Sequence, residues 1–294
     1  MFSLSLIVGI DSGLRWGGRL LSRALRLRGN LAGFSLLEMS IVLLIVGVIM
    51  GSGVVMLSGT IERKAVEETV RRQQVIKKAL LDFRRAFNRL PCPGDLTLAI
   101  SSENFGVEGG RTDQGSYVTC YKGDPVATFQ YPSFEDYGYG VEAGSVPTRT
   151  LQLPDEYMFD GWGRRMVYAV SENHLIDNAF TIYDITDTSS PITVYTDESL
   201  AVPRAQNVVY ALISYGKNGH GAYSHDGSTR ISTGSTLSDE YANCDCGDDA
   251  STRGSYLYIV LVDHEPTQST TTVTDRYDDI LAYVTRQDLR TEKE

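Results

Sequence analysis

An almost uncharged apolar segment near the start of the chain constrains its fold more than any other feature. In residues 34–57, Glu38 carries the only charged side chain. A helix of that length, at about 1.5 Å of rise per residue, can cross a bilayer core of about 30 Å. A carboxylate in hydrocarbon is costly, by about 2.5 kcal/mol or more for the related Asp, so we expect it to be functional and to have a cationic partner. The segment has no Lys or Arg, and cleavage between Gly33 and Phe34 would create the nearest cation, a new α-amine.

Residues 33–38 are Gly-Phe-Ser-Leu-Leu-Glu. Together with the apolar segment behind them, they resemble the cleavage and methylation motif of type IV prepilins and type II secretion pseudopilins. In that family a membrane peptidase cuts after the Gly and methylates the new amino-terminal Phe, and the Glu pairs with the amino terminus of a neighbouring subunit. The resemblance implies processing at Gly33 and Phe34 and an assembly role for Phe34 and Glu38. A signal anchor that happens to carry a glutamate is the alternative.

Residues 1–33 have the pattern of a leader that precedes the cleavage site. A short apolar stretch comes first, and the arginines after it are Arg15, Arg19, Arg23, Arg26 and Arg28. By the positive-inside rule they place this end in the cytoplasm. An ordinary secretory signal loses its apolar region on cleavage, whereas here that region stays in the mature chain. We expect a single-pass inner-membrane protein with a cytoplasmic N-terminus before cleavage and a C-terminal domain that is periplasmic or on an extracellular filament.

The expected helix has a transmembrane half at residues 34–57 and an amphipathic half at residues 58–90. In the amphipathic half, apolar side chains recur mostly at three- and four-residue steps: Ile61, Val66, Val70, Ile76, Leu80, Phe83, Phe87 and Leu90. That period predicts one buried face, and Pro91 ends the helix. We expect a single continuous helix of about 85 Å through both halves. A separate second helix, capped by Ser58 or Thr60, is the alternative.

Residues 91–294 make an acidic domain, large enough for one hydrophobic core. They hold 13 Lys and Arg against 31 Asp and Glu, a net charge of −18. We expect no binding of nucleic acid, because phosphate contacts require clustered Lys and Arg. Divalent cations or basic protein surfaces fit this charge as partners. An acidic surface that serves only solubility is the alternative.

The acidic domain is expected to be rich in β-strands. Short runs of Val, Ile and Tyr, bounded by Gly, Asp, Asn and Ser, occur at residues 166–170, 180–183, 208–214, 256–262 and 280–284. Such runs are typical of strands, and the amphipathic half of the helix would cover the sheet. The fold class we expect is α+β, with a long N-terminal helix packed on an antiparallel sheet. This is also the pilin-like fold that the resemblance implies.

Four cysteines follow the apolar segment: Cys92, Cys120, Cys244 and Cys246. Outside the inner membrane they would meet an oxidising compartment, so we expect disulfides. A Cys92–Cys120 bond would close a loop of about 29 residues and stabilise the domain by roughly 3 kcal/mol. Four cysteines allow three pairings, including a split arrangement that ties the first two to the last two. A zinc site is the rival interpretation, and the histidines available to it are His220, His225 and His264.

Two segments, residues 214–219 and 277–281, resemble the calcium-binding loop of the major pseudopilin, which lies after a strand and is followed by a late acidic pair. The resemblance suggests calcium as a cofactor. Its candidate ligands are Asn218, Asp226, Asp278 and Asp279. Calcium takes six to eight oxygen ligands, which carboxylates, amides and carbonyls of a Gly-rich loop can supply. Lys217 lies in the middle of this proposed site, and an ordinary exposed turn is the alternative.

No catalytic motif is found in the sequence. Residues 224–226, Ser-His-Asp, have the side-chain types of a triad, but a triad is formed in space and not by neighbours in sequence. We therefore expect no enzyme. The function expected is a filament subunit, a pseudopilin or minor type IV pilin, whose partners are other subunits, the prepilin peptidase and methyltransferase, and the inner membrane. An adhesin-like binding module on a pilus and a membrane-anchored protein that never assembles are the alternatives.

The motif generates a prediction about processing. In cells that contain the peptidase, the mature chain should begin with N-methylated Phe34. A substitution of Gly33 should hinder cleavage, because a peptidase that grips extended backbone there leaves no room for a side chain. Mass spectrometry of the purified membrane form measures both features, and an intact leader would contradict the prediction.

Overall fold

The computed structural model describes residues 35–113, 118–121, 140–177, 179, 190–197, 199–233, 237–244, 259–265 and 277–291. The predicted leader, both residues of the processing site, Cys246 and the strand expected at residues 180–183 lie outside the described residues. So do the side chains of residues 49–59, within the expected membrane span. By its contacts the chain divides into two units, Met1–Gly53 and Val54–Glu294, and each is described by itself.

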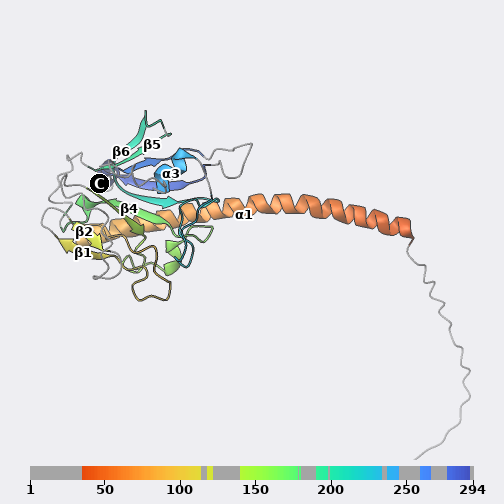
Figure 1. Cartoon of the computed structure of the whole chain (residues 1–294), viewed down its shortest axis with the longest axis horizontal. Helices are drawn as coiled ribbons and strands as arrows, with labels where there is room; N and C mark the ends of the chain where they lie inside the picture. The colour runs from red at the N-terminus through yellow and green to blue at the C-terminus, as the bar shows by residue number, and fades with distance from the viewer. Residues whose placement is uncertain are drawn as a thin grey trace, which may run out of the picture. The chain divides into compact units, whose positions relative to one another are not determined.

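One long helix, α1, runs from Leu36 to Phe87 (Figure 1). At its start the hydroxyl of Ser35 accepts a hydrogen bond from the Glu38 backbone N–H at 3.3 Å, as an N-cap residue does. At its end Asn88 adopts the left-handed conformation, with φ 53°, and donates its N–H to the Arg84 carbonyl. Asn is one of the residues that adopts this conformation at low cost, so α1 ends before Pro91 is reached.

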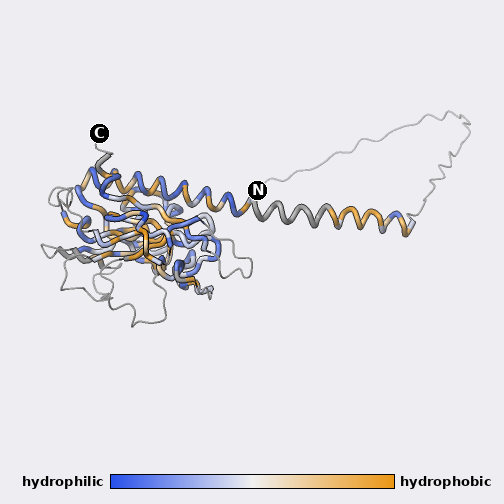
Figure 2. The backbone as a smooth tube through the Cα atoms, turned by 90° about the horizontal axis from the view of Figure 1, so that it is seen from above, coloured by the Kyte–Doolittle hydropathy of each residue, from blue (hydrophilic) through white to orange (hydrophobic). Residues whose placement is uncertain are grey.

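No helix in the described part of the chain is long and apolar enough to span a membrane. The membrane span at residues 34–57 stays a prediction. In the first unit, hydrophobic residues predominate in the described part of α1 (Figure 2). Its exposed large apolar side chains are Leu36, Leu37, Met39, Ile41, Val42, Leu43, Leu44, Ile45, Val46 and Val48.

In the second unit α1 buries one face against the domain. The buried positions are Ala65, Thr69, Gln73, Ile76, Leu80 and Phe83, at helical spacing. The sequence prediction is correct for the last three and for Leu90. It is wrong for four others, whose side chains are 38 to 60% exposed: Ile61, Val66, Val70 and Phe87.

A close backbone approach explains the exposure of the two valines. A Cβ atom built on Gly161 would lie 2.0 Å from the Ala65 carbonyl oxygen, so helix and loop are almost in backbone contact. Thr69 Oγ1 accepts the Gly161 N–H at 2.8 Å and donates to the Ala65 carbonyl at 2.8 Å. Only small or short polar residues fit this contact, and the neighbouring valines are turned outward.

The domain is built on one six-stranded sheet, with a separate two-stranded ribbon. The ribbon pairs β1 (Gly110–Asp113) with β2 (Val118–Tyr121). The sheet contains β3 (Val141–Ser145), β4 (Val167–Ser171), β5 (Ile192–Tyr195), β6 (Pro203–Ser214), β7 (Ile259–Val262) and β8 (Ile280–Thr285). Its order is β3-β4-β6-β5-β7, with β8 paired to β6, and every pairing is antiparallel except β5 with β7. The α+β class and the predominantly antiparallel sheet are confirmed.

Short helices complete the described structure: η1 (Asp155–Met158), η2 (Glu172–His174), α3 (Ser238–Cys244) and α4 (Arg286–Thr291). The second half of strand β6, residues 208–214, is buried on both faces. On one face Tyr210 and Leu212 pack in the core cluster that contains the buried apolar residues of α1. On the other face Ala211 and Ile213 pack in a second cluster that includes residues of the segment after β6 and Cys244 of α3.

Polar side chains of α1 also bind the domain. Gln73 is buried, and its Nε2 donates to the carbonyl oxygens of Leu212 on β6, at 3.3 Å, and Ile280 on β8, at 3.0 Å. Arg72 Nη1 donates to the carbonyl oxygens of Glu156 and Phe159, at 2.9 and 2.8 Å. These contacts connect one turn of α1 to two adjacent strands and to the loop that precedes β4.

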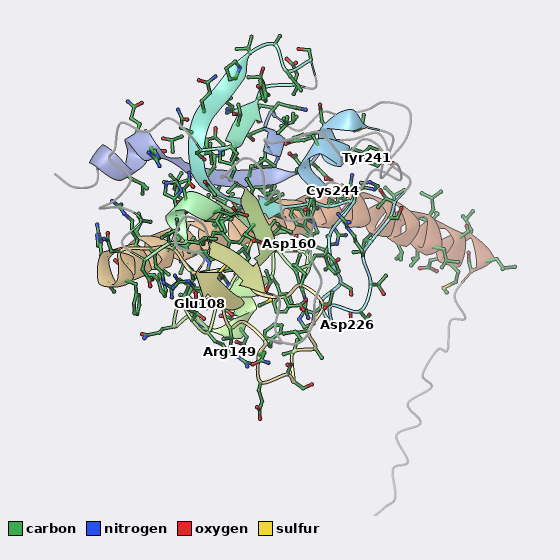
Figure 3. The ribbon with its side chains drawn as sticks, turned by 60° about the vertical axis from the view of Figure 1, so that its left-hand side comes forward. Glu108, Arg149, Asp160, Asp226, Tyr241 and Cys244 are labelled. Atoms are coloured by element: carbon green, nitrogen blue, oxygen red, sulfur yellow. A yellow bond between two sulfur atoms is a disulfide. The ribbon has the colours of Figure 1, made fainter. Side chains whose placement is uncertain are left out.

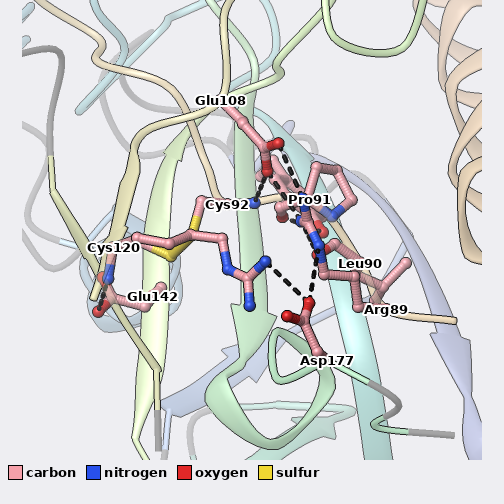
Figure 4. Close-up of a disulfide and its surroundings, with 10 residues drawn as sticks. Arg89, Leu90, Pro91, Cys92, Glu108, Cys120, Glu142 and Asp177 are labelled. Carbon is pink, nitrogen blue, oxygen red and sulfur yellow. Dashed lines mark hydrogen bonds and ion pairs between the residues drawn. A yellow bond between two sulfur atoms is a disulfide. The ribbon is translucent and has the colours of Figure 1, made fainter. Parts of the chain in front are cut away.

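Cys92 and Cys120 form a disulfide (Figure 4), which confirms one predicted bond. The split pairing and a zinc site that uses these two thiols are therefore wrong. The Glu108 carboxylate accepts the Cys92 N–H at 3.1 Å and forms an ion pair with Arg89 at 2.9 Å. The disulfide thus joins the chain just after α1 to the β1–β2 ribbon, and Asp177 extends the ion pairs by contacting Arg89 at 3.5 Å.

The buried amide of Gln73 gives a test of this packing. Gln73→Leu should lower the free energy of unfolding by about 1 to 3 kcal/mol, because the carbonyl oxygens of Leu212 and Ile280 lose a donor. The matched control is Gln74→Leu at the next, exposed position, which should change stability by less than about 0.5 kcal/mol. Denaturant unfolding of the purified protein measures both, and equal effects would contradict the proposed role of Gln73.

Candidate metal centre

The two acidic and Gly-rich segments singled out in the sequence do meet in the structure. Strand β6 ends at Ser214 and β8 begins at Ile280, and these two residues are register partners in an antiparallel pair. The end of one strand therefore lies beside the start of the other. Residues 216–218, just after β6, consequently face Asp278 and Asp279, just before β8.

Asp278 holds the turn after β6 in place. One carboxylate oxygen, Oδ2, accepts the backbone N–H groups of Lys217 and Asn218, each at 3.0 Å. Gly216 has φ 53°, and a Cβ atom there would lie 2.1 Å from the Asp278 carbonyl oxygen. The turn therefore requires glycine at this position, because of both its conformation and the lack of space.

A third acid completes a cluster that the sequence prediction does not contain. Glu240, in the first turn of α3, joins Asp278 and Asp279, and one carboxylate oxygen of each lies within 4.8 Å of the others. All three residues are buried, with exposed fractions of 0, 8 and 4%. A Ser-Asp-Glu sequence at residues 238–240 is a local indication of a helix start, but it does not reveal which surface that helix contacts.

Asn218 lies beside the cluster, but its amide nitrogen and not its oxygen faces the acids. Its Nδ2 donates to Glu240 Oε1, and its Oδ1 accepts the backbone N–H of His220 at 2.9 Å. In this arrangement Asn218 orients the Glu240 carboxylate. The prediction of Asn218 as a direct ligand is therefore corrected to a positioning role.

Asp226 does not belong to the cluster, so the prediction of Asp226 as a ligand is wrong. Its carboxylate accepts hydrogen bonds from the hydroxyls of Ser224 and Ser228 and from the Ser228 N–H, at 3.1 Å for the last. These bonds lower the pKa of Asp226 to about 2. Figure 3 shows Asp226 well apart from Tyr241 and Cys244 of α3. A local turn of this kind uses the oxygens that a distant cation would need.

Asp279 is held between the cluster and α3. Its Oδ2 accepts a hydrogen bond from Asn243 Nδ2 at 2.8 Å, while the Asn243 amide also bonds both backbone groups of Val262 on β7. Among the described residues, Oδ1 of Asp279 has no hydrogen-bond donor. Burial raises the pKa of Asp279 well above its usual range, and the neighbouring carboxylates of Glu240 and Asp278 raise it further.

The histidines predicted as zinc ligands do not assemble within the described part of the chain. His264 Nε2 contacts Asp239 at 2.9 Å, and its ring stacks on Tyr277 with centroids 3.8 Å apart. The ring of His225 stacks on Phe159, and Ser224 bonds Asp226, so the Ser-His-Asp sequence makes no triad in this arrangement. Within the described residues, no histidine or cysteine belongs to a group of three potential metal ligands. The cluster offers only carboxylate oxygens, which suit hard cations.

Comparison of the chain with protein-family models, with curated proteins and with solved structures found no match.

Asn218 and Asp226, whose predicted roles as ligands are corrected above, give a matched pair of variants. In chelator, Asn218→Asp should destabilise the fold by about 1 to 3 kcal/mol, because it removes the donor to Glu240 and adds a carboxylate beside it. Asp226→Asn, in an exposed turn, should destabilise the fold much less. Chemical unfolding of both proteins measures the difference, and an effect at Asp226 as large as that at Asn218 would overturn these assignments.

Proposed function

We propose that the chain is a filament subunit, a pseudopilin or minor type IV pilin, which a prepilin peptidase processes and which assembles through its N-terminal helix for type II secretion. The observation that supports this proposal is the division of α1 into two kinds of surface. In the second unit its side chains are committed to the domain, through Gln73, Ile76 and Leu80 among others. In the first unit, residues 36–48 expose ten large apolar side chains.

A helix surface of this kind needs a cover. Monomeric soluble proteins rarely expose contiguous apolar patches above a few hundred Å², and larger ones mark protein or membrane contacts. Residues 36–48 make almost four turns of helix, because an α-helix has 3.6 residues per turn. A lipid bilayer before assembly, and the helices of neighbouring subunits after it, would each cover such a surface.

Glu38 fits the same proposal. It lies in the first turn of α1, where a negative charge interacts favourably with the helix dipole. Among the described residues it forms no ion pair. An α-ammonium group on Phe34 of the next subunit would supply the cation that an acid in an apolar surface needs. The carboxylate would then both orient and select the neighbouring chain.

The disulfide supports the proposed compartment. Disulfides persist in oxidising environments such as the periplasm and the cell surface. The Cys92–Cys120 bond lies only five residues beyond the end of α1 at Phe87. A domain that lies outside the inner membrane would keep this bond oxidised and gain stability from it.

Substitution of Glu38 tests filament assembly separately from membrane insertion. Glu38→Ala should insert as well as the wild type, because it removes a costly charge from an apolar segment. Its incorporation into filaments should fall at least tenfold, because the proposed partner of the Phe34 α-ammonium is lost. Incorporation is measured by crosslinking whole cells and determining the length of the ladders of crosslinked subunits.

The control is Glu67→Ala, which removes an exposed acid from the same helix within the second unit. It should leave the ladders unchanged. Ladders that form as well in the Glu38→Ala variant as in the wild type would show that the pairing is wrong. Ladders absent from the wild type as well would instead favour an anchored protein that does not assemble.

A further inference from the structure

We infer that a stripe of side chains on α1 docks the acidic domain of a second copy of this chain. All members of the stripe lie within the second unit, and they are Arg63, Val66, Val70 and Lys77. Their steps of three, four and seven residues place the four side chains along one line of the helix. The contact joins second units alone, so the inference does not depend on membrane insertion or on the pairing proposed for Glu38.

The apolar part of the stripe is left uncovered by its own domain. Val66 and Val70 are 38 and 40% exposed. Each directly follows a residue, Ala65 or Thr69, that contacts Gly161. A polar side chain would be turned outward by that contact just as well, and valine has a lower helix propensity than Glu, Lys or Gln. Two valines one turn apart on an exposed line of a helix therefore favour a protein surface that covers them.

The basic part of the stripe is available to a partner. Arg63 and Lys77 form no ion pair with any of the residues that the structure describes. Glu62 lies beside the stripe, but its carboxylate already binds Lys217 at 2.8 Å. Glu67 lies on a neighbouring line of the helix, outside the stripe. Cations around an uncovered apolar surface match a partner that carries acids around its own contact surface.

The charge distribution of the chain identifies that partner. Residues 58–90 hold nine Lys and Arg against four Asp and Glu, a net charge of +5, whereas residues 91–294 carry −18. A second copy therefore offers a domain of opposite charge, and opposite potentials both attract and orient two proteins. The stripe and the acidic domain are different surfaces, so the contact is head-to-tail and can repeat from one copy to the next.

Sedimentation of the full chain, purified in a neutral detergent, tests the inference through self-association. At about 0.05 M salt the wild type should form complexes larger than the monomer. At about 0.5 M salt its dissociation constant should rise at least about tenfold, because salt screens the attraction between exposed charges. Arg63→Glu combined with Lys77→Glu should weaken association at low salt by at least about tenfold, because both positions then repel the acidic domain.

The matched control is Lys64→Glu combined with Lys78→Glu, which changes the net charge by the same amount. Both positions are exposed and lie one residue further along α1, about 100° around the helix from the stripe. This control should associate as the wild type does. Val66→Ser combined with Val70→Ser leaves the charge unchanged and provides a second test, since it should weaken association at both salt concentrations.

Three results would overturn the inference: a wild type that is monomeric at low salt, stripe variants that associate as the wild type does, and an equal loss in the stripe and control pairs. Glu38→Ala should associate as the wild type does in detergent, and a loss confined to that variant would place the contact at the N-terminus. A monomeric wild type whose melting temperature rises when phosphatidylglycerol is added to the micelles would identify lipid headgroups as the occupant, provided that the Arg63→Glu and Lys77→Glu variant does not respond.

Discussion

The contact between α1 and the sheet is the interaction on which the rest of the domain depends. It begins with a near backbone-to-backbone approach at Ala65 and Gly161 and continues through Gln73 into an apolar core. The Gln73 amide reaches carbonyl oxygens on both β6 and β8. One of these carbonyls belongs to Ile280, the residue directly after Asp279, so the helix, the central strands and the acidic cluster share one set of contacts.

This contact also explains why α1 has two surfaces. Within the second unit the helix needs small or polar residues where it meets backbone and large apolar ones where it meets side chains. Within the first unit, residues 36–48 do not alternate between these residue types and are apolar almost throughout. Filament assembly and membrane insertion both require a surface of this second kind, and the proposed function follows from its combination with Glu38.

The sequence predicts those parts of the fold that depend on local pattern. Helical periodicity identifies Ile76 and Leu80, and runs of β-branched residues identify β4, β6 and β8. Periodicity does not distinguish Val66 from Ala65, because the choice depends on Gly161, which is almost a hundred residues away. The same limit applies to the acidic cluster. The ends of paired strands bring Asp278 to the turn after β6, but Glu240 arrives on a short helix whose position is set by tertiary contacts.

Chemical labelling tests the central claim, that the apolar part of α1 is covered while its second part lies outside the membrane. Leu43→Cys and Glu67→Cys place single thiols on exposed positions of the two parts. In spheroplasts treated with a membrane-impermeant maleimide, the thiol introduced at position 67 should react and the thiol introduced at position 43 should not, until detergent exposes it. Equal reaction of both thiols in intact spheroplasts would contradict the account.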